Sequence, residues 1–167
     1  IPGMSVAQLI EELKGDLAVR RVEAQEELVR QGASVRGELI SALNKDSNNR
    51  RLETWGLWAL GRMKEPLPTI ASKSDNARIQ TLRILAHRNE NHSAQVMAAT
   101  LEDNSARIRH ESVLALHQLG PSSHVGELLN RAAAEQDRIV YYSVWQALRT
   151  LMSETQLRAA LKDDRAG

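Results

Sequence analysis

The chain has 167 residues and a mass of 18.6 kDa, a length at which one domain of ordinary size buries a substantial core. It contains no cysteine, which excludes a disulfide scaffold, a thiolate metal site and a cysteine nucleophile, and which leaves cytoplasm and periplasm equally open as its compartment. The 22 basic and 21 acidic side chains give a net charge of +1, which disfavours an extensive phosphate-binding surface.

The hydropathy pattern and the two ends of the chain further narrow the class of protein to which the chain could belong. No stretch approaches the roughly 18 apolar residues that a membrane-spanning helix needs, and residues 1–5 lack the features of a signal peptide. We therefore expect no membrane partner. The start without methionine, and an end at Asp163–Gly167 that resembles the opening of another repeat, indicate a piece of a longer protein.

Short and long helices are predicted to alternate along the chain, because apolar residues recur at helical spacing and no alternating strand pattern occurs. The short helices are expected near residues 5–14, 34–44, 66–72, 92–101, 122–135 and 154–162. Their longer partners are expected near residues 17–31, 49–63, 76–88, 105–119 and 138–152. Pro68 should reduce the third short helix to a stunted helix or a turn, since proline cannot donate an intrahelical hydrogen bond. The predicted fold class is all-α.

These helix pairs form an internal repeat. Each long helix carries an anchor leucine, with spacings of 32, 25, 31 and 32 residues: Leu28, Leu60, Leu85, Leu116 and Leu148. Four residues before each anchor stands a small or β-branched residue: Ala24, Gly56, Thr81, Ser112 and Val144. This i, i+4 pair predicts the buried stripe of each long helix. The repeats should span approximately residues 5–32, 33–64, 65–90, 91–120 and 121–152, with a partial repeat at 153–167.

Aspartate and glycine are expected to mark the helix ends. An aspartate follows the leucine that closes each of four short helices, and we expect its carboxylate to cap the following long helix: Asp16, Asp46, Asp103 and Asp163. Gly32 and Gly120, each four residues after an anchor leucine, are predicted to end their long helices.

The complete pattern resembles the HEAT repeats of bacteria, of the type also seen in phycobilisome-lyase-like proteins. In the first repeat the resemblance rests on Asp16, Val19, Arg20, Ala24, Leu28 and Gly32. In the fourth it rests on Asp103, Ile108, Arg109, Ser112, Leu116 and Gly120. The resemblance implies one domain over residues 1–167, a right-handed α-solenoid of about five helical hairpins and a C-terminal helix. It also implies a non-catalytic protein-interaction or spacer module.

Two short sequence segments resemble the HEAT sections of large bacterial proteins that join a dehydrogenase domain to a c-type cytochrome. They are Arg20–Leu28 and Arg107–Ser112. This resemblance implies a periplasmic spacer or docking domain, although the chain has no Cys-x-x-Cys-His motif for attaching haem.

The partner is expected to be another protein, or another domain of a longer parent chain, bound on the concave face that second helices form in solenoids of this type. Trp, Tyr and Arg are common anchors of protein interfaces. The predicted contact residues are Trp58, Arg83, His87, His110, Leu114 and Tyr142. Trp55 and Trp145 are instead expected to fill the core between repeats. A small-molecule ligand is not expected.

Two other functions are weighed against this one. A metal-dependent or lyase-like HEAT enzyme would use His110, Glu111 and His117, but His-Glu occurs once at this position of the repeats, where a di-iron centre needs several ligands. A DNA-binding HEAT-like protein would need a basic concave face, whereas acidic and basic residues interleave here. No motif for a nucleophile or a phosphate cradle occurs, so we expect no catalytic residues, no metal and no cofactor.

Overall fold

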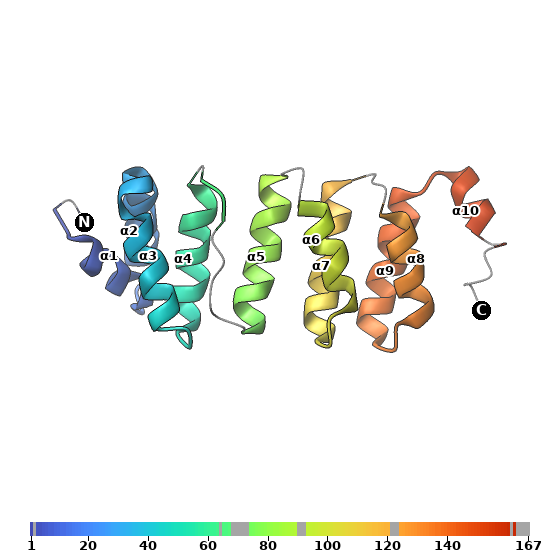
Figure 1. The fold of residues 1–167 in the computed structure, drawn as a ribbon, viewed down its shortest axis with the longest axis horizontal. Coiled ribbons are helices and arrows are strands. Elements are labelled where there is room, and N and C mark those ends of the chain that lie inside the picture. Colours follow the sequence, from blue (N-terminus) through green and yellow to red (C-terminus); the bar gives the residue numbers. More distant parts are fainter. Residues whose placement is uncertain are drawn as a thin grey trace. The chain divides into compact units, whose positions relative to one another are not determined.

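Every regular element in the described part of the chain is a helix (Figure 1). The structure is a computed structural model, and it describes residues 1, 3–63, 65–67, 74–89, 93–120, 124–160 and 162. The elements are α1 (Val6–Lys14), α2 (Ala18–Gln31), α3 (Ala33–Lys45), α4 (Arg50–Arg62), α5 (Asp75–Arg88), α6 (Ser93–Ala99), the 3-10 helix η1 (Thr100–Glu102), α7 (Ala106–Leu119), α8 (Val125–Ala134), α9 (Arg138–Leu151) and α10 (Glu154–Ala160). The all-α fold class is therefore confirmed.

The helix positions agree with those predicted from the apolar spacing. All five long helices begin and end within one residue of their expected bounds. The exception among the short helices is the one expected near residues 66–72. Pro66 and Leu67 are not helical, and residues 68–73 lie outside the described part of the chain. Within the described residues, no helix is long and apolar enough to cross a membrane.

The chain divides by packing into two compact units, Ile1–Ile84 and Leu85–Gly167. The first two expected repeats fall in the first unit, and the fourth and fifth fall in the second. The boundary between the units lies inside α5, in the third expected repeat, which is the one shortened to 25 residues between anchors.

The first unit is built from two helical hairpins, α1 with α2 and α3 with α4, that also pack against each other through α2 and α4. Its core is aliphatic, and the residues that carry it include Leu9, Leu13, Leu28, Leu39, Leu43, Leu52 and Leu60. Gly56 lets α4 approach α3 closely. A Cβ added there would lie 3.2 Å from Leu43 Cδ2 and 3.4 Å from Leu39 Cδ1. The small residue four positions before the anchor leucine therefore has the packing role that the repeat predicted.

The second unit repeats this arrangement. There α6 and η1 pack on α7, α8 packs on α9, and the two long helices α7 and α9 contact each other along their length. The anchor Leu116 and the small Ser112 are fully buried, as are Val144 and, to a slightly smaller degree, Leu148. The anchor pair of α5, Leu85 with Thr81, is only partly buried.

The prediction that Gly32 and Gly120 end their long helices is confirmed. Gly32 and Gly120 follow α2 and α7 with φ values of 61° and 86°, and each backbone N–H donates back to the last turn, to the carbonyls of Leu28 and His117. Such positive φ angles favour glycine, because a Cβ would clash with the backbone.

The predicted aspartate caps are wrong at the three described positions. Leu17 and Ser105 occupy the N-caps of α2 and α7 without a side-chain capping hydrogen bond, and Asn49 caps α4. Asp16 pairs with Arg51 at 2.5 Å and Asp46 pairs with Lys14 at 3.2 Å. Asp103 accepts from the backbone N–H of Ser105, and Asp163 lies outside the described residues. Each of these aspartates stands one to three residues before the N-cap position. Asp16 and Asp46 therefore form ion pairs between helices, and Asp103 orders the turn before α7.

Candidate functional site

The long helices α7 and α9 of the second unit form a continuous mixed surface. Residues one helical turn apart lie on the same side of a helix, so four positions of α9 and three of α7 share this side. We call it the α7–α9 surface: His110, Leu114, His117, Tyr142, Ser143, Gln146 and Thr150. Three of the six predicted contact residues, His110, Leu114 and Tyr142, are brought together on it.

Hydrogen bonds between imidazoles and hydroxyls fix the register of the α7–α9 surface. His110 Nδ1 lies 2.9 Å from Ser143 Oγ, and His117 Nε2 lies 2.6 Å from Thr150 Oγ1. Both hydroxyls also donate to carbonyls of α9, those of Ile139 and Ala147. Each imidazole is therefore tied to α9 through a hydroxyl that is itself tied to the α9 backbone.

Apolar groups stand exposed between these polar pairs. Leu114 is 41% exposed and Tyr142 is 60% exposed. The phenol oxygen of Tyr142 accepts from Gln146 Nε2 at 2.7 Å, and its ring centroid lies 6.0 Å from that of Trp145. Toward the beginning of α9 the ring borders an open depression that Asp137, Ile139 and Tyr141 also line. The surface therefore offers two exposed apolar groups, and a hydrogen bond holds the orientation of one of them, Tyr142.

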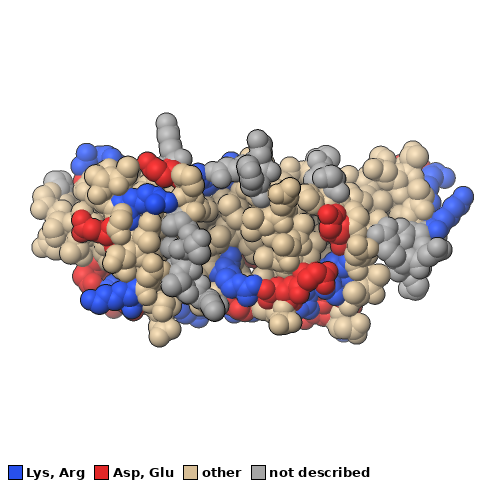
Figure 2. Space-filling view, in the orientation of Figure 1, with Lys and Arg blue, Asp and Glu red and all other residues tan. Residues whose placement is uncertain are grey.

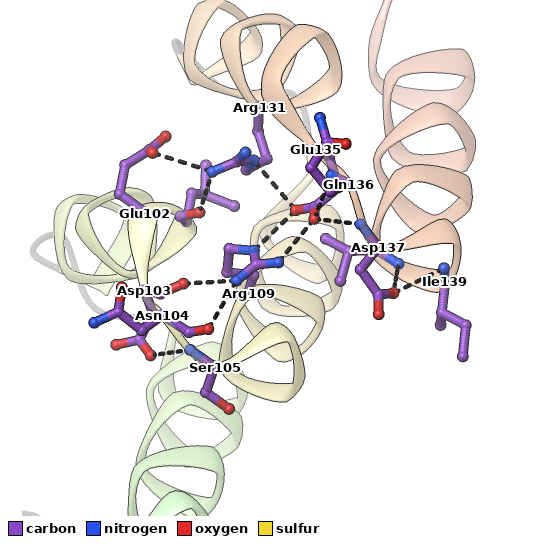
Figure 3. Close-up of polar contacts among 12 residues, drawn as sticks. Glu102, Asp103, Asn104, Ser105, Arg109, Arg131, Glu135, Gln136, Asp137 and Ile139 are labelled. Atoms are coloured by element: carbon purple, nitrogen blue, oxygen red, sulfur yellow. Dashed lines mark hydrogen bonds and ion pairs between the residues drawn. The ribbon is translucent and has the colours of Figure 1, made fainter.

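A buried charge cluster positions the helices beneath this surface (Figure 3). Glu135, whose side chain has no exposed area, accepts from Arg109 through both oxygens, at 2.8 and 2.9 Å. Arg131 lies 3.2 Å from the same carboxylate and 3.1 Å from Glu102. Arg109 also donates to the carbonyls of Asp103 and Asn104. The cluster thus joins the turn before α7 to the end of α8 and the start of α9.

The two neighbouring arginines, Arg109 and Arg131, keep Glu135 ionised. The hydrogen bonds from Arg109, the backbone N–H of Asp137 and the charge of Arg131 together lower the pKa of Glu135 from 4.5 to about 2, against burial, which raises it. The same hydrogen bond raises the pKa of Arg109. Glu135 is therefore ionised at every physiological pH. Its role is to hold the helices in place, since its two oxygens accept from Arg109 and from the backbone N–H of Asp137 (Figure 3).

The other predicted contact residues lie elsewhere. Trp58 and Arg83 belong to the first unit, and His87 is exposed in the last turn of α5. Trp58 is half-buried rather than fully exposed: it packs against the cluster of Leu57, Ala77 and Ile84, and its indole Nε1 donates to Gln80 at 3.0 Å.

One of the two tryptophans expected in the core is exposed. Trp55 is partly buried against the first unit's core, as expected, with the Arg21 guanidinium 5.4 Å from its ring centroid. The expectation for Trp145 is wrong, because 47% of it is exposed. The Arg149 guanidinium lies over its ring, 5.6 Å from the ring centroid. In the described residues no helix covers this side of α9 as α4 covers Arg21 and Gln25 of α2.

The positions of the histidine and acidic side chains decide whether they could hold a metal ion together. Glu111 is buried in α7, whereas His110 and His117 are hydrogen-bonded to hydroxyls of α9. Among the described residues, no group of three or more His, Cys, Asp and Glu side chains is arranged to hold a metal ion.

The distribution of charged side chains decides whether the surface could bind the phosphate backbone of a nucleic acid. On the face that Figure 2 draws, basic and acidic side chains lie side by side, and neither sign gathers into a broad patch. Many of the arginines are paired with carboxylates, as Arg20 is with Glu12 and Arg62 with Glu26. A protein that binds a phosphate backbone instead needs several uncompensated cations.

No protein-family model matches the chain, and no curated protein matches it with significant similarity. The assignment to the HEAT family therefore stays a prediction from the repeat pattern.

Proposed function

We propose that this chain is a helical-repeat protein of HEAT type that binds another protein, or another domain of a longer parent chain, and performs no catalysis. The proposed contact is the α7–α9 surface. The observation that carries the proposal is the exposure of Leu114 and Tyr142 on two packed helices that the hydrogen bond between His110 and Ser143 joins.

Three physical features support a protein partner. Exposed Tyr and Leu on rigid helices supply apolar area at small entropic cost, and the polar pairs around them resemble the rim of an interface. The depression beside Tyr142 gives room for one side chain of a partner. The imidazoles of His110 and His117 are held in place by Ser143 and Thr150, so the surface needs little reordering on binding.

The experiment is an affinity pull-down from a lysate of the source organism. Wild type is compared with a Leu114→Ala, Tyr142→Ala double variant and with Val96→Ala as a matched control. Val96 is 46% exposed on α6, a similar exposure outside the α7–α9 surface. We expect one protein to be captured by wild type and by Val96→Ala and lost with the double variant. Equal capture by all three would refute the proposed surface.

Metal content is measured on the same wild-type sample. The non-catalytic proposal expects no stoichiometric iron or zinc. Tightly bound metal together with no captured protein would replace the proposal by an enzyme that uses His110, Glu111 and His117.

A further inference from the structure

Two ion pairs connect the long helices of the first unit. Arg51 of α4 pairs with Asp16, which precedes α2, and Arg62 of α4 pairs with Glu26 of α2. Counted from the anchor leucines, the arginines stand nine residues before and two after the anchor of α4, and the carboxylates twelve and two before that of α2. Both arginines are thus compensated by carboxylates of this chain.

The second unit has no carboxylate or arginine at the four corresponding positions. Ile139 and Thr150 of α9 stand where the arginines stood, and Asn104 and Leu114 stand where the carboxylates stood. Ile139 is 66% exposed and Leu114 is 41% exposed. The exposure of Leu114 does not come from the end of the sequence, since α9, the next long helix, packs along α7. The surface is therefore apolar where the first unit is ionic.

Two exposed arginines flank this apolar surface. Arg107 stands one turn before His110 in α7, and Arg138 stands one turn before Tyr142 in α9, so both extend the α7–α9 surface toward the beginnings of the two helices. Both side chains are exposed, and neither forms an ion pair with any of the described residues.

The carboxylates around these arginines are already engaged. Asp137 caps α9 and Asp103 orders the turn before α7, each by accepting from backbone N–H groups. Glu135 is bound by two arginines of the buried cluster. The helices α7 and α9 themselves contain one carboxylate, that of Glu111, which is buried. The exposed ionised side chains of the two helices are therefore cations.

We propose that the partner segment bound by the α7–α9 surface is an acidic peptide that also carries apolar side chains. Its apolar side chains pack on Leu114, Ile139 and Tyr142, and its carboxylates pair with Arg107 and Arg138. The segment thus supplies the negative charge that the chain's own carboxylates supply in the first unit. This inference rests on the proposed function, because it names the chemistry of the partner at the same surface.

A nucleic acid fits the surface less well than a peptide does. Binding to a phosphate backbone relies on several uncompensated cations, whereas two arginines flank this surface. The exposed side chains of Leu114 and Ile139 lie where a peptide's apolar side chains can cover them, and a phosphate backbone has no such groups. An oligonucleotide therefore serves as a comparison in the test.

The test is fluorescence anisotropy of labelled probes with the purified chain. The acidic probe is a short synthetic peptide in which glutamates are interspersed with leucines and serines. Two comparison peptides have every glutamate replaced by glutamine or by lysine, and a single-stranded oligonucleotide of the same net charge is the fourth probe. We expect the acidic peptide to bind about tenfold more tightly than the other three, and its binding to weaken as salt is added.

Three arginine variants locate the contact. Arg107→Gln and Arg138→Gln should each raise the Kd of the acidic peptide about threefold and together about tenfold, since each removes one exposed ion pair. Arg50→Gln is the matched control, because Arg50 is exposed and stands in α4 at the repeat position of Arg138. It should leave the Kd unchanged. Because all three side chains are exposed, circular dichroism should show unchanged helix content and melting.

The outcomes separate this inference from the proposed function. If the glutamine peptide binds as tightly as the acidic one and Leu114→Ala weakens both, the acidic partner is overturned and the proposed contact surface stands. If Arg50→Gln weakens the acidic peptide as much as Arg107→Gln does, the peptide binds elsewhere and the inference is overturned. Tighter binding of the oligonucleotide would replace the peptide by a nucleic acid and contradict the proposed function as well. Absence of binding by the acidic peptide would also overturn the inference, and the pull-down then tests the proposed function separately.

Discussion

Replacing Glu135 by glutamine should destabilise the second unit in a pH-dependent manner. The carboxylate is fully buried and accepts two hydrogen bonds from Arg109, whereas an amide of the same shape has no charge. The pKa of Glu135 falls from 4.5 to about 2 in the folded protein. That shift corresponds to about 3 kcal/mol by which the ionised form stabilises the fold. We therefore expect Glu135→Gln to lower the free energy of unfolding by about 3 kcal/mol at neutral pH.

The sign of the pH dependence follows from the lowered pKa. The stabilisation is fully present above pH 4.5, where the carboxylate is ionised in both the unfolded and folded states. It is lost as the pH falls from 4.5 toward 2, because the unfolded chain takes up the proton first. The difference between wild type and Glu135→Gln should therefore shrink over that interval.

The assay is urea unfolding at a series of pH values. Trp145 fluorescence reports on the second unit when Trp55 and Trp58, both in the first unit, are replaced by phenylalanine. Glu154→Gln is the control, because Glu154 and Arg158 form an exposed pair, and it should change the unfolding free energy by less than about 0.5 kcal/mol. A difference between wild type and Glu135→Gln that stays constant from neutral pH down to pH 3 would refute the assigned role of the charge.

Two further pairs of variants test packing. Gly61→Ala places a Cβ 2.5 Å from Ile84 Cγ2 and should destabilise by about 1–3 kcal/mol, whereas Gly37→Ala, in α3 with no atom within 4 Å of its Cβ, should stabilise by about 0.5–1 kcal/mol. Thermal unfolding distinguishes the two, and equal shifts would contradict the close approach of α4 and α5 at Gly61. Leu116→Ala should lower the free energy of unfolding by about 2–5 kcal/mol through a cavity, whereas exposed Leu114→Ala should lower it by less than about 1 kcal/mol. Equal losses in urea unfolding would contradict the placement of Leu114 at the surface.

The helices could be predicted from the sequence because their signals are local. Apolar residues at helical spacing marked each long helix to within one residue, and Gly32 and Gly120 ended theirs as the need for positive φ requires. The capping aspartates failed because several polar side chains compete at each helix start. Asn49 caps α4, and Asp137, which the pattern did not single out, caps α9 by accepting from the N–H groups of Ile139 and Val140.

The site was harder to predict, because its contacts join residues of different repeats. Ser143 and Thr150 were missed as partners of His110 and His117, although both pairs are 33 residues apart, close to the repeat spacing, which is a usable signal. Glu135 gave no signal, since a glutamate at the end of a helix is ordinarily solvated. Trp145 was misplaced because periodicity shows which side of a helix is apolar and not whether a neighbour covers it.

The central claim is that the α7–α9 surface contacts a protein partner, and site-specific photo-crosslinking tests it most directly. A photoreactive phenylalanine analogue at position 114 is compared with the same analogue at position 96, since Leu114 and Val96 are about equally exposed. Irradiation in source lysate should produce one covalent adduct of defined mass at position 114 and none at position 96. No adduct at position 114, or the same adducts at both positions, would contradict the claim.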